Sequence, residues 1–423
     1  MERRRFLRGV IGLLGAPAAS PGEWPEWRGA SRDGAVAAAP RKGNWPEKLA
    51  LLWEREVGEG YPGPVAAGDR VWIHARRGNR EVVSCLRLAS GTVVWTAEYD
   101  APFEQDESAR MHGRGPYSTP ALADGRLFTF GVNSVLSVWD AGAGKLLWRK
   151  ESAKEFNPGF PFFGQASSPL VWGGLLFVHM GGHDRKQPME APGVGAIVAL
   201  SVADGRETWR WSKQAPAIAA SPLICNFEGW SQLVFKTNQH LVGLDPVTGQ
   251  ELWQFPCKVP MDNTIVTPLV ADGRLLNSDY EQGVSAWRIQ STGASWTARQ
   301  LWRTREASLS MSSPVLAGGQ VVGFSHFRKG QLFGLDPSDG RLLWQGEPRS
   351  GEHATLISWG DEVLAFLEDG SLVVGGVARD GFRPLQTYRL GNSGGWAHPA
   401  VAGGRLLLRD GSRLAAYRLD AES

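Results

Sequence analysis

Short apolar runs separated by turn residues repeat along most of the chain. Runs such as 126–130, 320–324 and 405–408 alternate or are rich in β-branched residues, which is typical of β-strands. The segments 245–250 and 336–341 read as hairpin turns, because Pro fixes φ and Gly accepts a positive φ. No window shows a convincing helical period. The pattern therefore predicts an all-β protein made of many short antiparallel strands.

One block of sequence recurs, and it organises the chain. Each block opens with a small or polar residue before Pro, and most close with Gly followed four residues later by Trp. The openings are Gly63-Pro64, Thr119-Pro120, Ser168-Pro169, Ser221-Pro222, Thr267-Pro268, Ser313-Pro314 and His398-Pro399. The closing aromatic residues, 42 to 61 positions apart, are Trp53, Trp95, Trp148, Trp209, Trp253, Trp302, Trp344 and Tyr388. Four short β-runs in a period of this size indicate a propeller blade, and counting predicts eight blades.

The last block predicts how the ring closes. It begins at His398 and ends near Leu419, after its third strand. The missing fourth strand is supplied by residues 51–53 near the N-terminus. Such closure leaves no free edge between the first and last blades. We therefore expect one domain over 51–420, an eight-bladed β-propeller with four-stranded antiparallel blades.

The N-terminal segment has the pattern of an export signal. Arg3, Arg4 and Arg5 precede a short apolar run at 9–16 and an Ala-Pro-Ala step at 16–18. We read 1–20 as a twin-arginine-like signal, with a Sec signal or an uncleaved basic tail as alternatives. No Cys follows the apolar run, so a lipoprotein is not expected, and the run is too short to span a membrane. We expect an exported periplasmic or extracellular protein in which residues 21–50 form a leader packed on the propeller.

Composition and motifs narrow the function. The 45 Lys and Arg nearly balance the 43 Asp and Glu, which argues against nucleic-acid binding. Three Cys cannot form a disulfide framework, and no Cys-x-x-Cys is present. The common hydrolase and nucleotide-binding signatures are also absent from the sequence. We therefore predict no catalytic residue and no metal site, in a protein that is a monomer.

Two motifs resemble a known family. The segment Leu244 to Trp253 resembles the tryptophan-docking motif of the PQQ-like repeat family, the quinoprotein alcohol dehydrogenase-like propellers. Residues 24–34 resemble the leader common in secreted bacterial members. The resemblance implies that each closing Trp wedges between adjacent blades. Most Trp residues are thereby assigned to the structure rather than to a ligand.

The long segments of the blades are expected on one face of the ring, while the other face carries tight turns. Long polar loops on a rigid scaffold commonly carry function. The candidate ligand- or partner-binding residues are Arg110, His112, Arg114, Tyr117, His183, Asp262, Asn263, His353, Trp396 and His398. The cluster 110–114 could meet a carboxylate, a phosphate or a quinone oxygen. The alternative is that these residues are solvated or pair with the acidic residues at 104–107.

The resemblance leaves two functions open. The first is a non-catalytic scaffold similar to BamB-like proteins, which would bind an envelope protein, a small ligand or a polymer through the loop face. The second is a PQQ-dependent alcohol dehydrogenase with calcium, in which Asp262 and Asn263 could supply oxygen ligands. Enzymes of that family hold the quinone with a disulfide of two adjacent Cys, and no two Cys are adjacent here. We therefore favour the scaffold without a cofactor.

Overall fold

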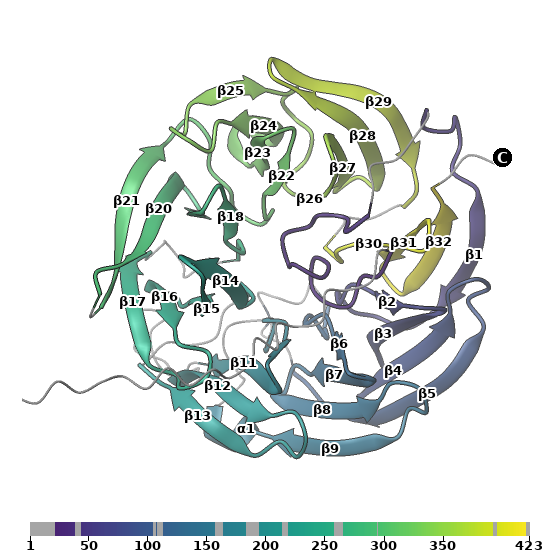
Figure 1. Cartoon of the computed structure of the whole chain (residues 1–423). Coiled ribbons are helices and arrows are strands. Elements are labelled where there is room, and N and C mark those ends of the chain that lie inside the picture. The colour runs from purple at the N-terminus through teal and green to yellow at the C-terminus, as the bar shows by residue number, and fades with distance from the viewer. Residues whose placement is uncertain are drawn as a thin grey trace, which may run out of the picture.

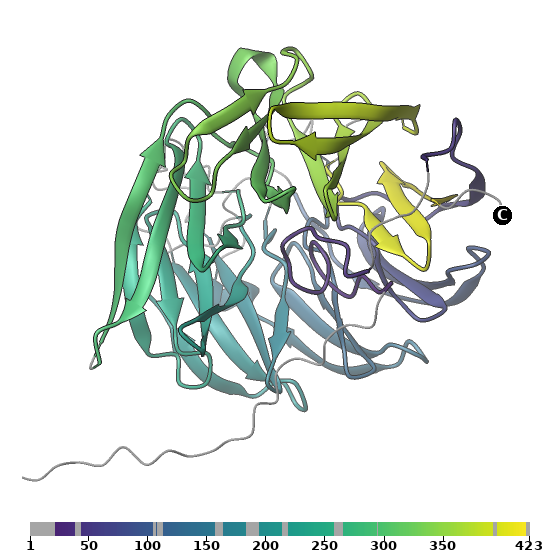
Figure 2. The same cartoon turned by 45° about the horizontal axis from the view of Figure 1, so that its top comes forward.

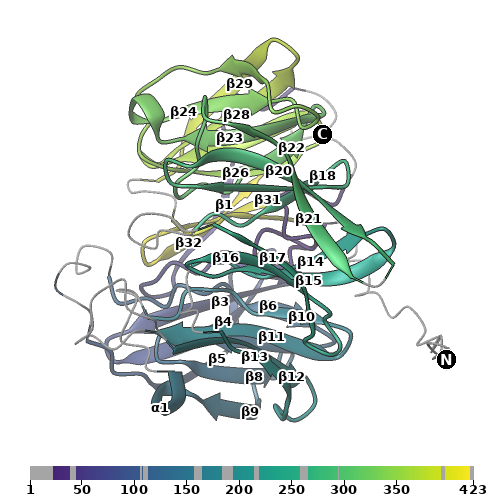
Figure 3. The same ribbon diagram turned by 90° about the vertical axis from the view of Figure 1, so that its left-hand side faces the viewer.

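The chain forms a closed ring of eight sheets around a central channel (Figure 1). The computed structural model describes residues 22–38, 44–104, 107, 113–156, 164–182, 194–213, 219–257, 265–293, 295–391 and 396–419. Every sheet has four antiparallel strands, and the first strand of each blade is innermost. Figure 3 views the ring from its side, where the sheets of neighbouring blades lie face to face. The predicted eight-bladed propeller is therefore confirmed.

The first half of the ring contains blades 1 to 4, in chain order. Blade 1 comprises β2 (Val65–Ala67), β3 (Arg70–Arg77), β4 (Arg80–Arg87) and β5 (Val93–Asp100). Blade 2 comprises β6 (Ala121–Ala123), β7 (Arg126–Phe130), β8 (Val135–Asp140) and β9 (Leu146–Glu151). Blade 3 comprises β10 (Leu170–Trp172), β11 (Leu175–Gly182), β12 (Val194–Ser201) and β13 (Glu207–Trp211). Blade 4 comprises β14 (Leu223–Phe227), β15 (Trp230–Lys236), β16 (His240–Leu244) and β17 (Glu251–Pro256).

The second half contains blades 5 to 8. Blade 5 comprises β18 (Leu269–Ala271), β19 (Arg274–Asp279), β20 (Gly283–Ser291) and β21 (Trp296–Thr304). Blade 6 comprises β22 (Val315–Ala317), β23 (Gln320–Ser325), β24 (Gln331–Leu335) and β25 (Leu342–Gln345). Blade 7 comprises β26 (Ala354–Trp359), β27 (Glu362–Leu367), β28 (Ser371–Ala378) and β29 (Gly381–Arg389). Blade 8 comprises β30 (Ala400–Ala402), β31 (Arg405–Asp410), β32 (Arg413–Arg418) and β1 (Leu51–Glu56).

The ring closes through β1, as the sequence predicts. This strand pairs antiparallel with β32, and Trp53 lies opposite Ala416. The first strand of the chain is thus the outer strand of the last blade. Because both chain ends share one sheet, the described part of the ring has no open edge between blades 8 and 1.

Helix is almost absent from the described residues. α1 (Ala153–Phe156) is a single turn after β9, and its Phe156 is buried between blades 2 and 3. A 3-10 turn, η3 (Phe327–Lys329), follows β23. Neither of these short helices has the length or apolar character needed to cross a membrane, and no other described helix does.

Five of the closing Trp residues link one blade to the next. Each places its ring on the Gly of the following blade's last turn and donates its indole N–H to a carbonyl of that turn. The donor and acceptor pairs are Trp53 and Leu88, Trp95 and Ala141, Trp148 and Val202, Trp209 and Pro246, and Trp302 and Pro337, at 2.8 to 3.1 Å. The Gly is needed because a Cβ at Gly249, for example, would lie 2.6 Å from the ring of Trp209.

Two closing Trp residues depart from the pattern that the family resemblance implies. Trp253 and Trp344 pack among residues of the next blade, but they donate to Gln232 (2.6 Å) and Gln320 (2.7 Å) of their own blades. The reason is that blades 5 and 7 lack the docking turn. A Cβ at Gly293 in blade 5 would meet nothing within 4 Å. The Trp side chains of blades 4 and 6 therefore satisfy their N–H groups internally.

Candidate functional site

Residues 22–38, here called the leader plug, form a loop in the middle of the ring (Figures 1 and 2). The loop begins beside the tight turn of blade 8, where the Gly403 N–H donates to the Gly22 carbonyl (3.0 Å). It ends beside the last residues of β26, where the Val36 N–H donates to the Ser358 carbonyl (2.8 Å). The leader plug therefore enters and leaves on the face of tight turns, and its tip points toward the face with the long loops.

Two buried arginines anchor the tip across the channel. Arg28 donates to the carbonyl of Pro314, just before β22, and Arg32 donates to that of Pro169, just before β10. Arg32 also pairs with Glu26 (3.2 Å), whose pKa burial raises to about 7 although Arg32 opposes the shift. The tip thus bridges blade 3 and blade 6, on opposite sides of the channel.

The residues that precede Pro in the repeat form a partial belt of hydrogen bonds beside the channel, which links blades 1 to 4 and blades 5 to 6. In each case the hydroxyl accepts the backbone N–H of the equivalent residue one blade earlier. The donor and acceptor pairs are Gly63 and Thr119, Thr119 and Ser168, Ser168 and Ser221, and Thr267 and Ser313, at 2.9 to 3.0 Å. These hydrogen bonds hold the residues at which the loops between blades join the inner strands. The repeat contains the signal for them, since five of the seven openings carry Ser or Thr.

A small pocket opens on the long-loop face, where the leader plug meets blades 6, 7 and 8. Its volume is about 40 Å³, and its side walls include Trp27, Arg28, Met311, His353, Trp396 and His398. The rings of His353 and Trp396 lie 3.9 Å apart between centroids with a tilt of 30°. His398 packs against Trp24 (5.9 Å) and edge-on against Trp27 (5.3 Å). Aromatic rings thus surround a buried guanidinium.

His398 is neutral in this setting. Burial lowers its pKa to about 3, and the positive charge of Arg28 acts in the same direction. Its Nδ1 lies 2.8 Å from the carbonyl of Pro399, so Nδ1 carries the proton and donates. Burial also lowers the pKa of Arg28 to about 10, which leaves this residue charged at neutral pH. The pocket therefore holds one positive charge from these two residues.

The predicted site residues fall into three groups. His353, Trp396 and His398 converge on the pocket. Arg114 and Tyr117 lie between blades 1 and 2, away from it. The third group lies outside the described residues and comprises Arg110, His112, His183, Asp262 and Asn263. The sequence thus indicated half of the pocket wall, but it did not indicate Trp27 or Arg28 as site residues.

Arg114 and Tyr117 have local roles in the structure. Arg114 donates to Asn79 (3.2 Å) and Gly78 (3.3 Å), and its own carbonyl accepts from Arg76. Tyr117 donates to the Gly113 carbonyl (2.6 Å), and its ring stacks on that of Tyr61 at 5.3 Å between centroids. Burial raises the pKa of Tyr117. These contacts hold the loop between blades 1 and 2.

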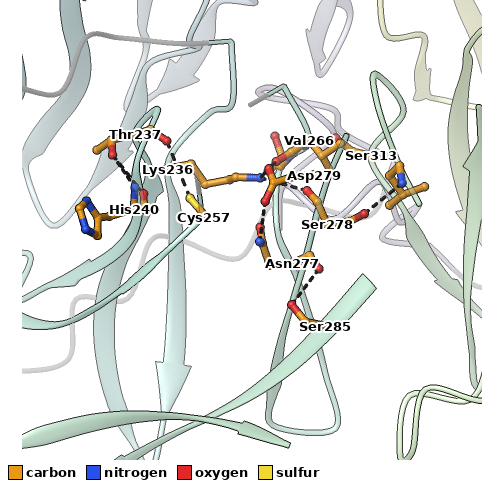
Figure 4. Close-up of polar contacts among 12 residues, drawn as sticks. Lys236, Thr237, His240, Cys257, Val266, Asn277, Ser278, Asp279, Ser285 and Ser313 are labelled. Atoms are coloured by element: carbon orange, nitrogen blue, oxygen red, sulfur yellow. Dashed lines mark hydrogen bonds and ion pairs between the residues drawn. The ribbon is translucent and has the colours of Figure 1, made fainter. Parts of the chain in front are cut away.

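Buried charges tie other blades together near the long-loop face. Lys236, at the end of β15, contacts Asp279 at the end of β19 and donates to Ser278 and Val266 (Figure 4). Both charged side chains are almost fully buried. The side-chain amide of Asn277 donates a further hydrogen bond to the Asp279 carboxylate (2.9 Å). No local sequence pattern indicates this pair, because its partners are 43 residues apart and belong to different blades.

A second buried network joins blade 1 to the turn after β7 of blade 2. Glu81 accepts from Tyr99 and from the Val132 N–H, and it pairs with His74 and Arg76 at 3.2 Å each. Burial alone would raise the pKa of Glu81, but its hydrogen bonds, above all the one with His74, lower it. All partners of the carboxylate are internal, so this network is a structural support.

The described residues supply neither a disulfide nor a cluster of metal ligands for PQQ with calcium, while the candidate ligands Asp262 and Asn263 lie outside the described part of the chain. Cys85, Cys225 and Cys257 are free and buried, so they supply no disulfide. Burial raises the pKa of Cys225 and Cys257 to about 12, which keeps both thiols protonated. In the part of the chain that the structure describes, no three His, Cys, Asp or Glu side chains gather as metal ligands. The leader plug also lies in the middle of the channel.

Eight four-stranded blades linked by Trp and Gly contacts define a PQQ-like repeat propeller. The comparison with protein families agrees. The family model described as outer membrane protein assembly factor BamB matches residues 79–346, and the chain belongs to this family. A search of curated proteins finds no match.

Solved structures with the same fold have different functions. BamB from Moraxella catarrhalis is 15% identical, with a TM-score of 0.62, over 89% of this chain and 99% of that one. Quinohemoprotein alcohol dehydrogenase from Comamonas testosteroni is also 15% identical, with a TM-score of 0.66, over 96% and 82%. The computationally designed Ika8 protein reaches 12% identity and a TM-score of 0.60, over 88% and 100%. At these identities the likeness shows the fold alone.

Proposed function

We propose that this chain is an exported, non-catalytic propeller that binds a protein or a small ligand in the cell envelope through its long-loop face. The observation that carries the proposal is the leader plug. It lies in the middle of the ring and is hydrogen-bonded to the blades, and it enters from the face of tight turns, whereas the pocket opens on the opposite face. Such a molecule presents one binding surface on a rigid ring.

The chemistry of the described residues supports binding rather than catalysis. The buried acids and bases are engaged with each other or with backbone groups, as in the pairs Lys236–Asp279 and His74–Glu81. General acid–base catalysis requires a titratable group near neutral pH within reach of a substrate. His398, which lines the pocket, has a pKa of about 3 and so cannot serve as a base that alternates near pH 7.

Location in the envelope is part of the proposal. The basic and apolar segment at the N-terminus supports export, and membership of the BamB-described family supports an envelope role. A fusion of residues 1–30 to a reporter that is active only after export tests this part. We expect activity that is lost when Arg3, Arg4 and Arg5 are replaced by Gln.

Two experiments test the binding role. In the first, the purified protein is titrated with PQQ and calcium and assayed with an artificial electron acceptor over a panel of alcohols. We expect neither calcium-dependent saturable binding nor turnover. Tight binding with turnover would replace the proposal by a quinoprotein dehydrogenase.

In the second experiment, a photo-crosslinking residue is placed on each face of the exported protein in cells. Lys329 is exposed on the long-loop face, and Asp124 is exposed in a tight turn on the other face. We expect specific adducts from position 329 and few from position 124. Adducts that form equally at both positions would contradict a single working face.

A further inference from the structure

The guanidinium of Arg28 offers donors that the protein does not use. Its Nη2 donates to the carbonyls of Asp33 (2.8 Å) and Pro314. Its Nε and Nη1 are buried and have no hydrogen-bond partner among the described residues. Arg28 is only 1% exposed, and it lines the pocket. Buried donors of a charged group are normally satisfied, so these two point to a ligand.

Arg32, the other buried arginine of this loop, also has an Nε without a hydrogen-bond partner in the described part of the chain, but its Nη1 and Nη2 are both engaged. It is equally buried, but it pairs with the carboxylate of Glu26 and with two carbonyls. Arg28 has no ion pair within 4 Å among the described side chains. The two residues differ in one respect that matters here: Arg32 has a carboxylate from the chain, while Arg28 faces a pocket.

The charge of the pocket favours an anion. Arg28 is charged at neutral pH, while burial lowers the pKa of the neighbouring His398 and keeps it neutral. Charge-assisted hydrogen bonds from a guanidinium to a carboxylate are among the strongest in proteins. A carboxylate is also planar and smaller than phosphate or sulfate, which suits a small pocket.

The opening of the pocket selects what is attached to that carboxylate. Trp396 is 37% exposed at this opening, and its ring is supported from one side by His353. An exposed Trp face that is held in place is suited to stacking with a second aromatic ring. Met311, also in the wall, adds a side chain that adapts to irregular apolar surfaces.

We propose that this pocket binds a carboxylate whose attached aromatic group packs on Trp396. Arg28 holds the carboxylate, and His353 and His398 shape the wall. The inference deepens the proposed function, on which it rests, because it names the chemistry recognised on the long-loop face. The carboxylate can belong to a free aromatic acid or to the C-terminus of a peptide that ends in an aromatic residue.

Ligand-observed NMR on the full chain tests the proposal, since it detects weak binding. The probes are benzoate, for a free acid, and N-acetylphenylalanine, for a peptide C-terminus. Benzamide and N-acetylphenylalanine amide are the neutral controls. We expect saturable binding of at least one acid and at least about tenfold weaker binding of its amide. Which acid binds identifies the source of the carboxylate.

Three variants assign the binding to the pocket. Arg28→Gln is expected to weaken binding by about tenfold or more, and Trp396→Ala by about two- to tenfold. Arg274→Gln is the control, because it removes an arginine whose Nε also has no hydrogen-bond partner among the described residues but which begins β19 on the tight-turn face, outside the pocket lining. We expect it to bind within about twofold of the wild type once circular dichroism shows that it is folded.

Trp396→Ala keeps the test valid if Arg28→Gln fails to fold, because Trp396 is partly exposed. The proposal is overturned if neither acid binds at tens of millimolar, if acids and amides bind equally, or if binding is unchanged in Trp396→Ala. The crosslinking experiment does not depend on the carboxylate. A failure here with adducts from position 329 would therefore remove the ligand chemistry and leave the scaffold role.

Discussion

Replacement of Gly249 by Ala tests how much the Trp contacts between blades stabilise the ring. A Cβ at this position would lie 2.6 Å from two ring carbons of Trp209, well inside the normal separation of about 3.5–4.0 Å. Gly293 occupies the equivalent place in blade 5, where a Cβ would meet nothing within 4 Å. Both residues have positive φ, 72° and 87°. The backbone strain is therefore shared, and only Gly249→Ala displaces a docked ring.

The expected magnitudes follow from the contacts. An L-residue in the left-handed region costs about 1–2 kcal/mol, and both variants bear this cost. Gly249→Ala also forces the ring of Trp209 outward, which as overpacking costs about 1–3 kcal/mol. The hydrogen bond from Trp209 to the Pro246 carbonyl (3.1 Å) is lost as well, at about 1 kcal/mol. We expect a loss of about 3–6 kcal/mol for Gly249→Ala and about 1–2 kcal/mol for Gly293→Ala.

Equilibrium urea unfolding, followed by far-UV circular dichroism, measures the difference. Ellipticity is preferable to fluorescence because the 19 Trp residues would give a mixed signal. The slope of the free energy against urea should be the same for both variants, which shows that the unfolded states are comparable. Equal losses of free energy in the two variants would refute the docking argument, since they would leave only the shared backbone strain.

Two further predictions concern buried charges. Asp279→Asn leaves Lys236 buried without a counter-charge and should lower the free energy of unfolding by about 3–5 kcal/mol. The double replacement of Lys236 by Met and Asp279 by Leu should restore most of the midpoint of thermal unfolding. A midpoint that is unchanged in Asp279→Asn would contradict this prediction. His398 has a pKa of about 3 in the folded protein and about 6.5 when unfolded, so on acidification the unfolded state binds a proton before the folded state does. The free energy of unfolding therefore falls below pH 6.5, by up to about 1.4 kcal/mol per pH unit. His398→Asn should therefore lose stability less steeply than the wild type between pH 7 and pH 4 in urea unfolding, and equal slopes would rule out the neutral buried state.

The repeat made most of the fold predictable because its signals are local. Each block carries its own turn and its own closing aromatic residue, so a pattern of about forty residues suffices to count blades. The same locality explains the departure at Trp253 and Trp344. The docking partner of a Trp belongs to the next block, and in blades 5 and 7 the Gly of the last turn, Gly293 or Gly381, lies against no Trp ring. A reading that compares each Trp with the following turn would have found both.

The pocket was only half predictable, for a different physical reason. His353 and Trp396 precede inner strands, and the repeat places such residues on one face. Arg28 comes from the leader, which has no repeat pattern, and its contact with Pro314 spans 286 residues. No local signal specifies where a segment without strand periodicity will dock. The two arginines among its aromatic residues were the available sign, since buried guanidinium groups can anchor a segment through hydrogen bonds to backbone carbonyls.

Docking of the leader and formation of the pocket depend on the same contacts. Trp27 and Arg28 belong to the leader plug, and they also line the pocket. His398 packs against both Trp24 and Trp27, so it contacts the plug from the pocket side. Protonation of His398 would place a second positive charge beside Arg28 and weaken the plug. A ligand carboxylate would do the opposite, because it compensates the charge of Arg28. A ligand bound at this pocket should therefore stabilise the plug, and loss of the plug should abolish the pocket.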